Sequence, residues 1–177
     1  MTAKEINYIA KAAESWESWA DALKIALTEK QKAVLGEVAG PDKGSHHLNL
    51  DHAEGKTFLT AFEATRWCMS RPHSRVLLVC PTLIQSKHIW IPEAKRMVER
   101  NPILSSAYTF TQSGFRMFGE QGYDWGCVVG TSNYQSLQGY CSNHLLVIAE
   151  EHRNMSSDAR ACISGYSLGG KVIYTGR

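Results

Sequence analysis

Three short polar clusters follow apolar runs, and their residue types suit the chemistry of a nucleoside triphosphate. Gly55-Lys56-Thr57 is the end of a phosphate-binding loop, in which backbone N–H groups and a lysine face phosphates and a hydroxyl reaches Mg²⁺. Glu150-Glu151 and Thr175-Gly176 each end a later apolar run. Hydrolysis requires one carboxylate to hold Mg²⁺ and another to polarise the attacking water. We therefore expect Glu150 to bind metal and Glu151 to act as the catalytic base.

The loop departs from the pattern G-x-x-x-x-G-K-[ST]. Leu50 takes the place of the first glycine, Ala53 takes the place of another, and Asp51 and Glu54 add acidic groups. A carboxylate near a triphosphate is unfavourable unless it points to solvent, and alanine has less backbone freedom than glycine. No arginine lies within the loop. The predicted ATP-binding residues of this segment are His52, Ala53, Glu54, Gly55, Lys56 and Thr57, and Thr57 is also a predicted metal ligand.

Composition restricts the class of protein. The 177 residues suit one domain with a small helical extension, and a net charge of +2 is too small to indicate nucleic-acid binding. Five scattered cysteines without a C-x-x-C pair favour free thiols over disulfides or zinc. No apolar run approaches the ~18 residues of a membrane span. We expect a cytoplasmic protein with no membrane partner.

The N-terminal region has helical periodicity. Apolar residues recur at three- and four-residue steps over 3–26, which predicts one helix, and Trp19 lies off its apolar stripe. We expect residues 1–27 to form a helical extension and 28–177 to form the ATPase domain. The extension either packs on that domain or docks a partner through Trp19.

Gln31 has two interpretations. Thr28-Glu29-Lys30-Gln31 fits the capping box, in which the threonine and glutamine side chains bond backbone N–H groups at a helix start. Many translocating ATPases instead use a glutamine shortly before the phosphate loop to bind adenine. Both interpretations remain open from the sequence, and Gln31 is a predicted ATP-binding residue.

The remaining pattern predicts an α/β fold. Apolar runs indicate strands at 75–80, 144–149 and 171–174, and 46–50 is predicted as the strand that feeds the loop. Residues 115–118 with 125–129 suggest a hairpin. Helices are predicted at 58–69 and at 84–100, where Pro92 should kink or divide the helix. This alternation predicts a three-layer P-loop NTPase sandwich with a mostly parallel sheet. The strand before Glu150 should lie beside the strand that feeds the loop.

Several segments together resemble one family. They are 55–59, 71–82, 137–140, 144–151 and 169–176, and in this order they are similar to the ATPase domain of phage large terminase subunits over residues 25–177. In that family Glu150 stands where Asp is usual. The resemblance implies that Thr175 and Gly176 couple hydrolysis to movement.

The resemblance also implies cofactors and partners. It implies an ATP- and Mg²⁺-dependent motor that moves double-stranded DNA into a procapsid. The partners would be the portal protein and a small terminase subunit, with copies of the chain forming a homo-oligomeric ring. The sequence ends at Arg177, before the remaining strands of such a domain. We therefore expect a sheet that is incomplete at its C-terminal side and no nuclease domain.

Two alternatives remain. Ala149-Glu150-Glu151-His152 mimics the Asp-Glu-x-His motif of helicase and Swi/Snf-type translocase motor domains, with the first Asp replaced. The acidic loop would also suit a non-hydrolysing interaction module that keeps the P-loop fold. All the motor hypotheses require Lys56 and Glu151 to meet in one site.

Overall fold

The computed structural model describes residues 2–51, 53–119, 122–131 and 133–176. Its described strands form one seven-stranded sheet in the order β1-β7-β6-β2-β5-β4-β3. The strands from β1 to β5 in this order are parallel, and β4 is antiparallel to both of its neighbours. The predicted mostly parallel sheet is therefore confirmed. The strands are β1 (Gly44–His47), β2 (Arg75–Cys80), β3 (Tyr108–Thr111), β4 (Gly114–Met117), β5 (Gly126–Thr131), β6 (Leu145–Ala149) and β7 (Lys171–Tyr174).

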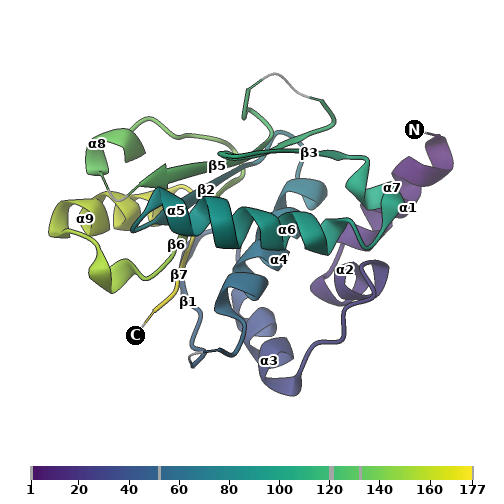
Figure 1. Cartoon of the computed structure of the whole chain (residues 1–177), viewed down its shortest axis with the longest axis horizontal. Helices are drawn as coiled ribbons and strands as arrows, with labels where there is room; N and C mark the ends of the chain where they lie inside the picture. Colours follow the sequence, from purple (N-terminus) through teal and green to yellow (C-terminus); the bar gives the residue numbers. More distant parts are fainter. Residues whose placement is uncertain (1, 52, 120–121, 132, 177) are drawn as a thin grey trace.

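Helices cover both faces of this sheet. Side chains alternate along a strand, so Val76 and Leu78 of β2 enter one apolar core while Leu77 and Val79 enter the other. Helices α1 to α4, α6 and α7 pack on the first core, and α8 and α9 lie on the opposite face (Figure 1). The three-layer prediction is confirmed. The helices are α1 (Ala3–Ala13), α2 (Trp16–Ala22), α3 (Glu29–Val38), α4 (Lys56–Ser70), α5 (Leu83–Gln85), α6 (Ile91–Val98), α7 (Pro102–Ser105), α8 (Tyr134–Leu137) and α9 (Ser157–Gly165).

The prediction of one N-terminal helix over 3–26 is wrong. The chain breaks at Ser15, whose extended backbone and side-chain oxygen cap α2 by accepting the Ser18 N–H at 3.1 Å. The break changes the direction of the helical face, and Trp19 is completely buried in the same core as α4. The alternative of a docking helix that uses Trp19 thereby loses the observation on which it rested.

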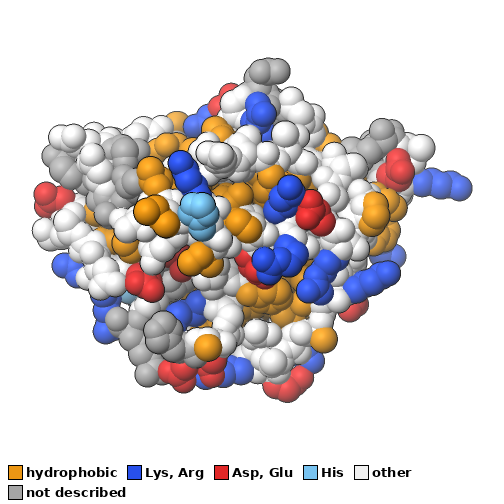
Figure 2. Space-filling view, viewed as in Figure 1, with side chains coloured by type: hydrophobic (Ala, Val, Ile, Leu, Met, Phe, Trp, Pro, Cys, Tyr) orange, Lys and Arg blue, Asp and Glu red, His pale blue; other side chains and the backbone are white. Residues whose placement is uncertain are grey.

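The helix predicted over 84–100, which Pro92 was expected to kink or divide, is interrupted directly before Pro92. A π-helical turn, Ser86–Trp90, separates α5 from α6, and the Ile91 N–H bonds the Ser86 carbonyl across it. Pro92 follows directly in the first turn of α6, where its missing N–H is tolerated. The turn directs Trp90 inward. Apolar side chains around α5 reach the surface, whereas basic and acidic groups mix over α6 (Figure 2).

The hairpin prediction is confirmed by β4 and β5, which pair antiparallel. The short strand β3 and the helices α8 and α9 were not predicted. Of the described residues, no helix is long and apolar enough to cross a membrane.

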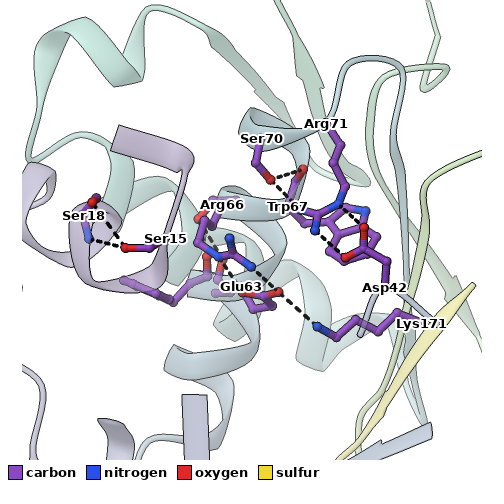
Figure 3. Close-up of polar contacts among 12 residues, drawn as sticks. Ser15, Ser18, Asp42, Glu63, Arg66, Trp67, Ser70, Arg71 and Lys171 are labelled. Carbon is purple, nitrogen blue, oxygen red and sulfur yellow. Dashed lines mark hydrogen bonds and ion pairs between the residues drawn. The ribbon is translucent and has the colours of Figure 1, made fainter. Parts of the chain in front are cut away.

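A buried charged cluster lies in the C-terminal half of α4 (Figure 3). Arg66 donates two hydrogen bonds of 2.9 Å to Glu63, and both side chains are nearly inaccessible. Lys171, at the start of β7, is fully buried with its Nζ 3.6 Å from Glu63 Oε1 and without a hydrogen-bond partner. Desolvation lowers the pKa of Lys171, and the charge of Glu63 opposes that effect.

Candidate nucleotide site

The loop between β1 and α4 has the backbone of a phosphate cradle. Gly55 caps α4 with φ 90°, and a Cβ there would lie 3.0 Å from the Gln31 side-chain nitrogen. Ala53 also has a positive φ, 64°, a conformation that costs a non-glycine residue about 1–2 kcal/mol. The sequence predicts that alanine restricts the backbone at position 53. The structure agrees, because this position has a backbone conformation that favours glycine. Strand β1 ends at His47, earlier than the predicted strand 46–50.

Lys56 is the first residue of α4 and lies across this loop. Its Nζ donates to the carbonyl oxygens of Leu50 at 3.1 Å and Asp51 at 3.3 Å. The ammonium is thus held where phosphates would approach the helix N-terminus.

The acidic groups of the loop pair with a lysine from α3. Lys30 Nζ lies 2.6 Å from Glu54 Oε1 and 3.5 Å from Asp51 Oδ2, and Glu54 also accepts the Asp51 N–H. The bond from Lys30 lowers the pKa of Glu54, and the bond to Glu54 raises the pKa of Lys30. Lys30 therefore offsets the negative charge that makes this loop unusual.

Gln31 forms the predicted capping box. Its Oε1 accepts the Thr28 N–H at 3.1 Å, and its Nε2 donates to the Glu54 carbonyl at 3.2 Å. The capping interpretation is confirmed. The same side chain also ties α3 to the loop.

Glu150 follows β6 and is fixed by hydroxyl groups. The Thr60 hydroxyl of α4 donates to Oε1 at 2.7 Å, and the Thr175 hydroxyl donates to Oε2 at 3.1 Å. Trp90 Nε1 in turn donates to Thr60 Oγ1 at 3.0 Å. Burial raises the pKa of Glu150, and the two hydroxyl bonds oppose the rise because they favour the carboxylate.

The strand that carries Glu150 is not the neighbour of the strand that feeds the loop. That prediction is wrong, since β7 lies between β1 and β6 and pairs in parallel with both. The last residues after β7 therefore separate the loop from the acidic pair. This insertion brings Thr175 into contact with Glu150.

Glu151 is bound to the segment after β7. It has φ 50°, its N–H donates to Thr175 Oγ1 at 3.1 Å, and the next N–H, of His152, donates to the Thr175 carbonyl at 3.2 Å. Gly176 has φ 91°, and a Cβ there would lie 3.1 Å from Glu151 Cα. Thr175 and Gly176 are therefore packed against the acidic pair.

Lys56 and Glu151 line the same cavity, of about 550 Å³, so the predicted meeting of these residues is confirmed. This volume lies within the range of small-molecule sites. The residues lining the cavity are Leu50, Asp51, Lys56, Glu151, Arg153, Asn154 and Gly176.

No protein-family model and no characterised protein matches the chain by sequence. A solved structure, the Thermus phage P74-26 large terminase ATPase domain, is 16% identical with a TM-score of 0.64 over 90% of this chain and 68% of that one. The chain has the fold of a phage large terminase ATPase domain. A variant of the same domain gives equal values. The HK97 bacteriophage large terminase is 20% identical with a TM-score of 0.55, over 85% of this chain and 33% of that one.

This terminase ATPase fold is the one that the sequence resemblance implied. Most of the predicted site residues line three neighbouring cavities, and the buried Thr175 lines none of these three. Lys56, Glu151 and Gly176 line the first, described above. Thr57, Glu150 and Glu151 line a second cavity of about 130 Å³. Gln31, Ala53, Glu54 and Gly55 line a third of about 310 Å³. His52 lies outside the described residues.

Several residues around the candidate site were not identified from the sequence. Lys30 and Thr60 reach the site from helices, and Trp90 reaches it from the π-helical turn. Nothing in the local sequence marks these three. The sequence gives only a weak indication for Arg153 and Asn154, which is that they lie within three residues of Glu151.

Proposed function

We propose that this chain binds and hydrolyses ATP with Mg²⁺ as the motor domain of a DNA-packaging terminase. The observation that carries the proposal is the shared cavity of Lys56 and Glu151 in a chain with the terminase ATPase fold. The lysine supplies positive charge for phosphates, and the carboxylate lines the same space.

The donor set fits Mg²⁺. Thr57 and Glu150 line one cavity and offer oxygen atoms, and a carboxylate that accepts one bond on each oxygen still has lone pairs free. Mg²⁺ in nucleotide sites takes one or two carboxylates together with phosphates and water. A site of this kind does not require three clustered acidic or imidazole ligands. The described residues contain no such cluster. Bound Mg²⁺ would neutralise charge on the phosphate oxygens.

The chain's own residues would perform the remaining chemistry. Lys56 and the N–H groups at the start of α4 would hold the β- and γ-phosphates. Glu151 would accept a proton from water as the water oxygen bonds the γ-phosphorus. The bond from that phosphorus to the bridging oxygen breaks, and its electron pair leaves with ADP. Because Thr175 bonds both Glu150 and the Glu151 N–H, a shift of either residue would move the segment after β7.

The test is nucleotide binding with and without Mg²⁺, followed by phosphate release. We expect the chain to hydrolyse ATP, Lys56→Ala to lose nucleotide affinity, and Glu151→Gln to bind ATP without turning it over. Lys43→Ala is a matched control, because Lys43 is exposed and lies outside the three cavities. An absence of affinity at millimolar ATP would contradict the proposal.

One observation favours a second candidate, an interaction module that does not hydrolyse ATP. Within the loop, Glu54 accepts the Asp51 N–H and Lys56 donates to two loop carbonyls, so donors that would face phosphates have internal partners. Under this hypothesis the loop stays closed when ATP is added. The binding titration above distinguishes the two candidates.

The partners and location follow as part of the proposal. We propose double-stranded DNA, a portal protein, a small terminase subunit and a working ring of copies, in the cytoplasm. The basic side of α6 is a weak candidate for DNA contact. Lys95 lies 3.7 Å from Glu99 and Arg96 lies 2.8 Å from Glu93, so these cations already have acidic partners.

A further inference from the structure

Arg153 lines the proposed nucleotide cavity and lies in a fixed turn. The left-handed backbone of Glu151 leads into a 3₁₀ turn, His152–Asn154. His152 bonds the Thr175 carbonyl through its N–H at 3.2 Å, and Asn154 Nδ2 donates to Glu151 Oε2 at 3.0 Å. The backbone on both sides of Arg153 is therefore held in place beside the proposed base.

The Arg153 side chain is uncommitted. It is exposed, it lines the cavity, and it forms no hydrogen bond or ion pair with the residues that the structure describes. The nearby lysines differ from it. Lys30 is paired with Glu54 and Asp51, and Lys56 donates to two carbonyls.

The cavity needs further positive charge to hold a triphosphate. Its charged lining consists of Asp51 and Glu151 against Lys56 and Arg153. Asp51 is paired with Lys30, so without Arg153 the lining would offer only Lys56, beside bound Mg²⁺, to the charge of a triphosphate, because the loop itself contains no arginine. Guanidinium groups bind phosphate through two parallel N–H bonds, which suits this position.

We propose that Arg153 is a further catalytic residue, which binds the γ-phosphate of ATP from the same chain as Lys56 and stabilises the charge that develops during its transfer. This inference rests on the proposed ATPase function. The γ-phosphate is assigned because Arg153 lies two residues after Glu151, whose water must attack that phosphorus. Lys56 and the N–H groups at the start of α4 hold the β-phosphate and share the γ-phosphate with Arg153.

The test compares Arg153→Ala, Arg153→Lys and the unaltered chain in steady-state phosphate release, together with binding of ADP and a β,γ-methylene analogue of ATP. We expect Arg153→Ala to lower kcat by about 100-fold, as loss of one charge-stabilising donor does. It should weaken binding of the analogue more than binding of ADP. Arg153→Lys should recover part of the rate, because a lysine keeps the charge but loses the fork geometry.

Arg160→Ala is the control, since Arg160 is an exposed arginine of α9 outside the cavity. It should leave rate and binding unchanged. Two results would overturn the inference: equal rates for Arg153→Ala and the unaltered chain, or equal weakening of analogue binding and ADP binding. If Lys56→Ala still abolishes nucleotide binding, either result overturns only the role of Arg153 and leaves the proposed function standing. If the unaltered chain neither binds nor hydrolyses ATP, the proposed function fails and this inference fails with it.

Discussion

Helix α4 carries charged groups at two places that differ in almost every respect. At its first residue, Lys56 borders a cavity that also contains Glu151 and Arg153, and these groups remain partly exposed. Two turns later, Glu63 and Arg66 are sealed in the core with Lys171. Both places contain one or more cations beside a carboxylate.

The two places differ in whether the charged groups have hydrogen-bond and ion-pair partners within the protein. Glu63 has both oxygens bonded by Arg66, and its side chain is buried. Glu151 has a cavity before it, and Arg153 has no partner in the described structure. Buried charges that are paired hold a structure together, whereas exposed charges around a cavity remain available for a ligand. We therefore expect the same substitution to act on activity at one place and on stability at the other.

The largest effect is expected from Glu151→Gln. Loss of the proposed base should lower the phosphate-release rate by about 10²–10⁴-fold. Stability should change by less than about 0.5 kcal/mol, because the amide oxygen can still accept a bond from Asn154. Phosphate release and urea unfolding of the same sample measure both quantities. A rate that stays within a factor of a few would remove Glu151 from the catalytic role.

Glu63→Gln should have the opposite profile. It leaves Arg66 and Lys171 as buried cations without a carboxylate, which should lower the free energy of unfolding by about 3–5 kcal/mol. The control is Glu29→Gln, which breaks an exposed pair with Lys32 at 2.6 Å and should cost less than about 1 kcal/mol. Urea unfolding compares them. Equal stabilities for these two variants would show that the buried cluster is not structural.

Gly176→Ala should have a smaller effect that touches both properties. The φ of 91° should cost alanine about 1–2 kcal/mol, and the new Cβ would press on Glu151 Cα. Hydrolysis should fall as well, because the base is displaced. Gly36→Ala is the matched control: Gly36 is in α3 with nothing near its Cβ position, so alanine should stabilise by about 0.5–1 kcal/mol. Thermal unfolding should show a lower melting temperature for Gly176→Ala and a higher one for Gly36→Ala than for the unaltered chain.

Lys171→Met should have the smallest effect and a characteristic pH dependence. The cluster holds two cations and one carboxylate, so removing the unbonded cation should stabilise the fold by about 1 kcal/mol at neutral pH. The pKa of Lys171 lies below 10.5 when folded, so between the two values the unfolded chain binds more protons. The unaltered chain should therefore gain stability as pH rises through this window.

Lys171→Met has no lysine to titrate at this position, so it lacks the gain in stability. The difference in unfolding free energy between Lys171→Met and the unaltered chain should therefore shrink as pH rises. Unfolding free energies near neutral pH and near pH ~10 measure this. A difference that is constant with pH would mean that Lys171 keeps its ordinary pKa in the fold.

Much of the architecture follows from short-range patterns. Strands β2, β6 and β7 are continuous apolar runs, and α3 begins at a capping box that needs only four neighbouring residues. The break at Ser15 was missed because a helical stripe can be drawn through it, and only packing of Trp19 shows which side is inside.

For the site, the sequence by itself determined which residues we propose to carry the chemistry: Lys56 after its glycine, the two acids after an apolar strand, and Thr175 with Gly176 after the next. These signals are local because each motif needs only a strand end and a turn. Tertiary structure alone decided the insertion of β7 between β1 and β6, the pairing of Lys30 with Glu54, and the burial of Lys171. It also decided that Arg153 and Lys56 line one cavity. The physical reason is that charge pairing and desolvation depend on distances between segments far apart in the chain, which no local pattern contains.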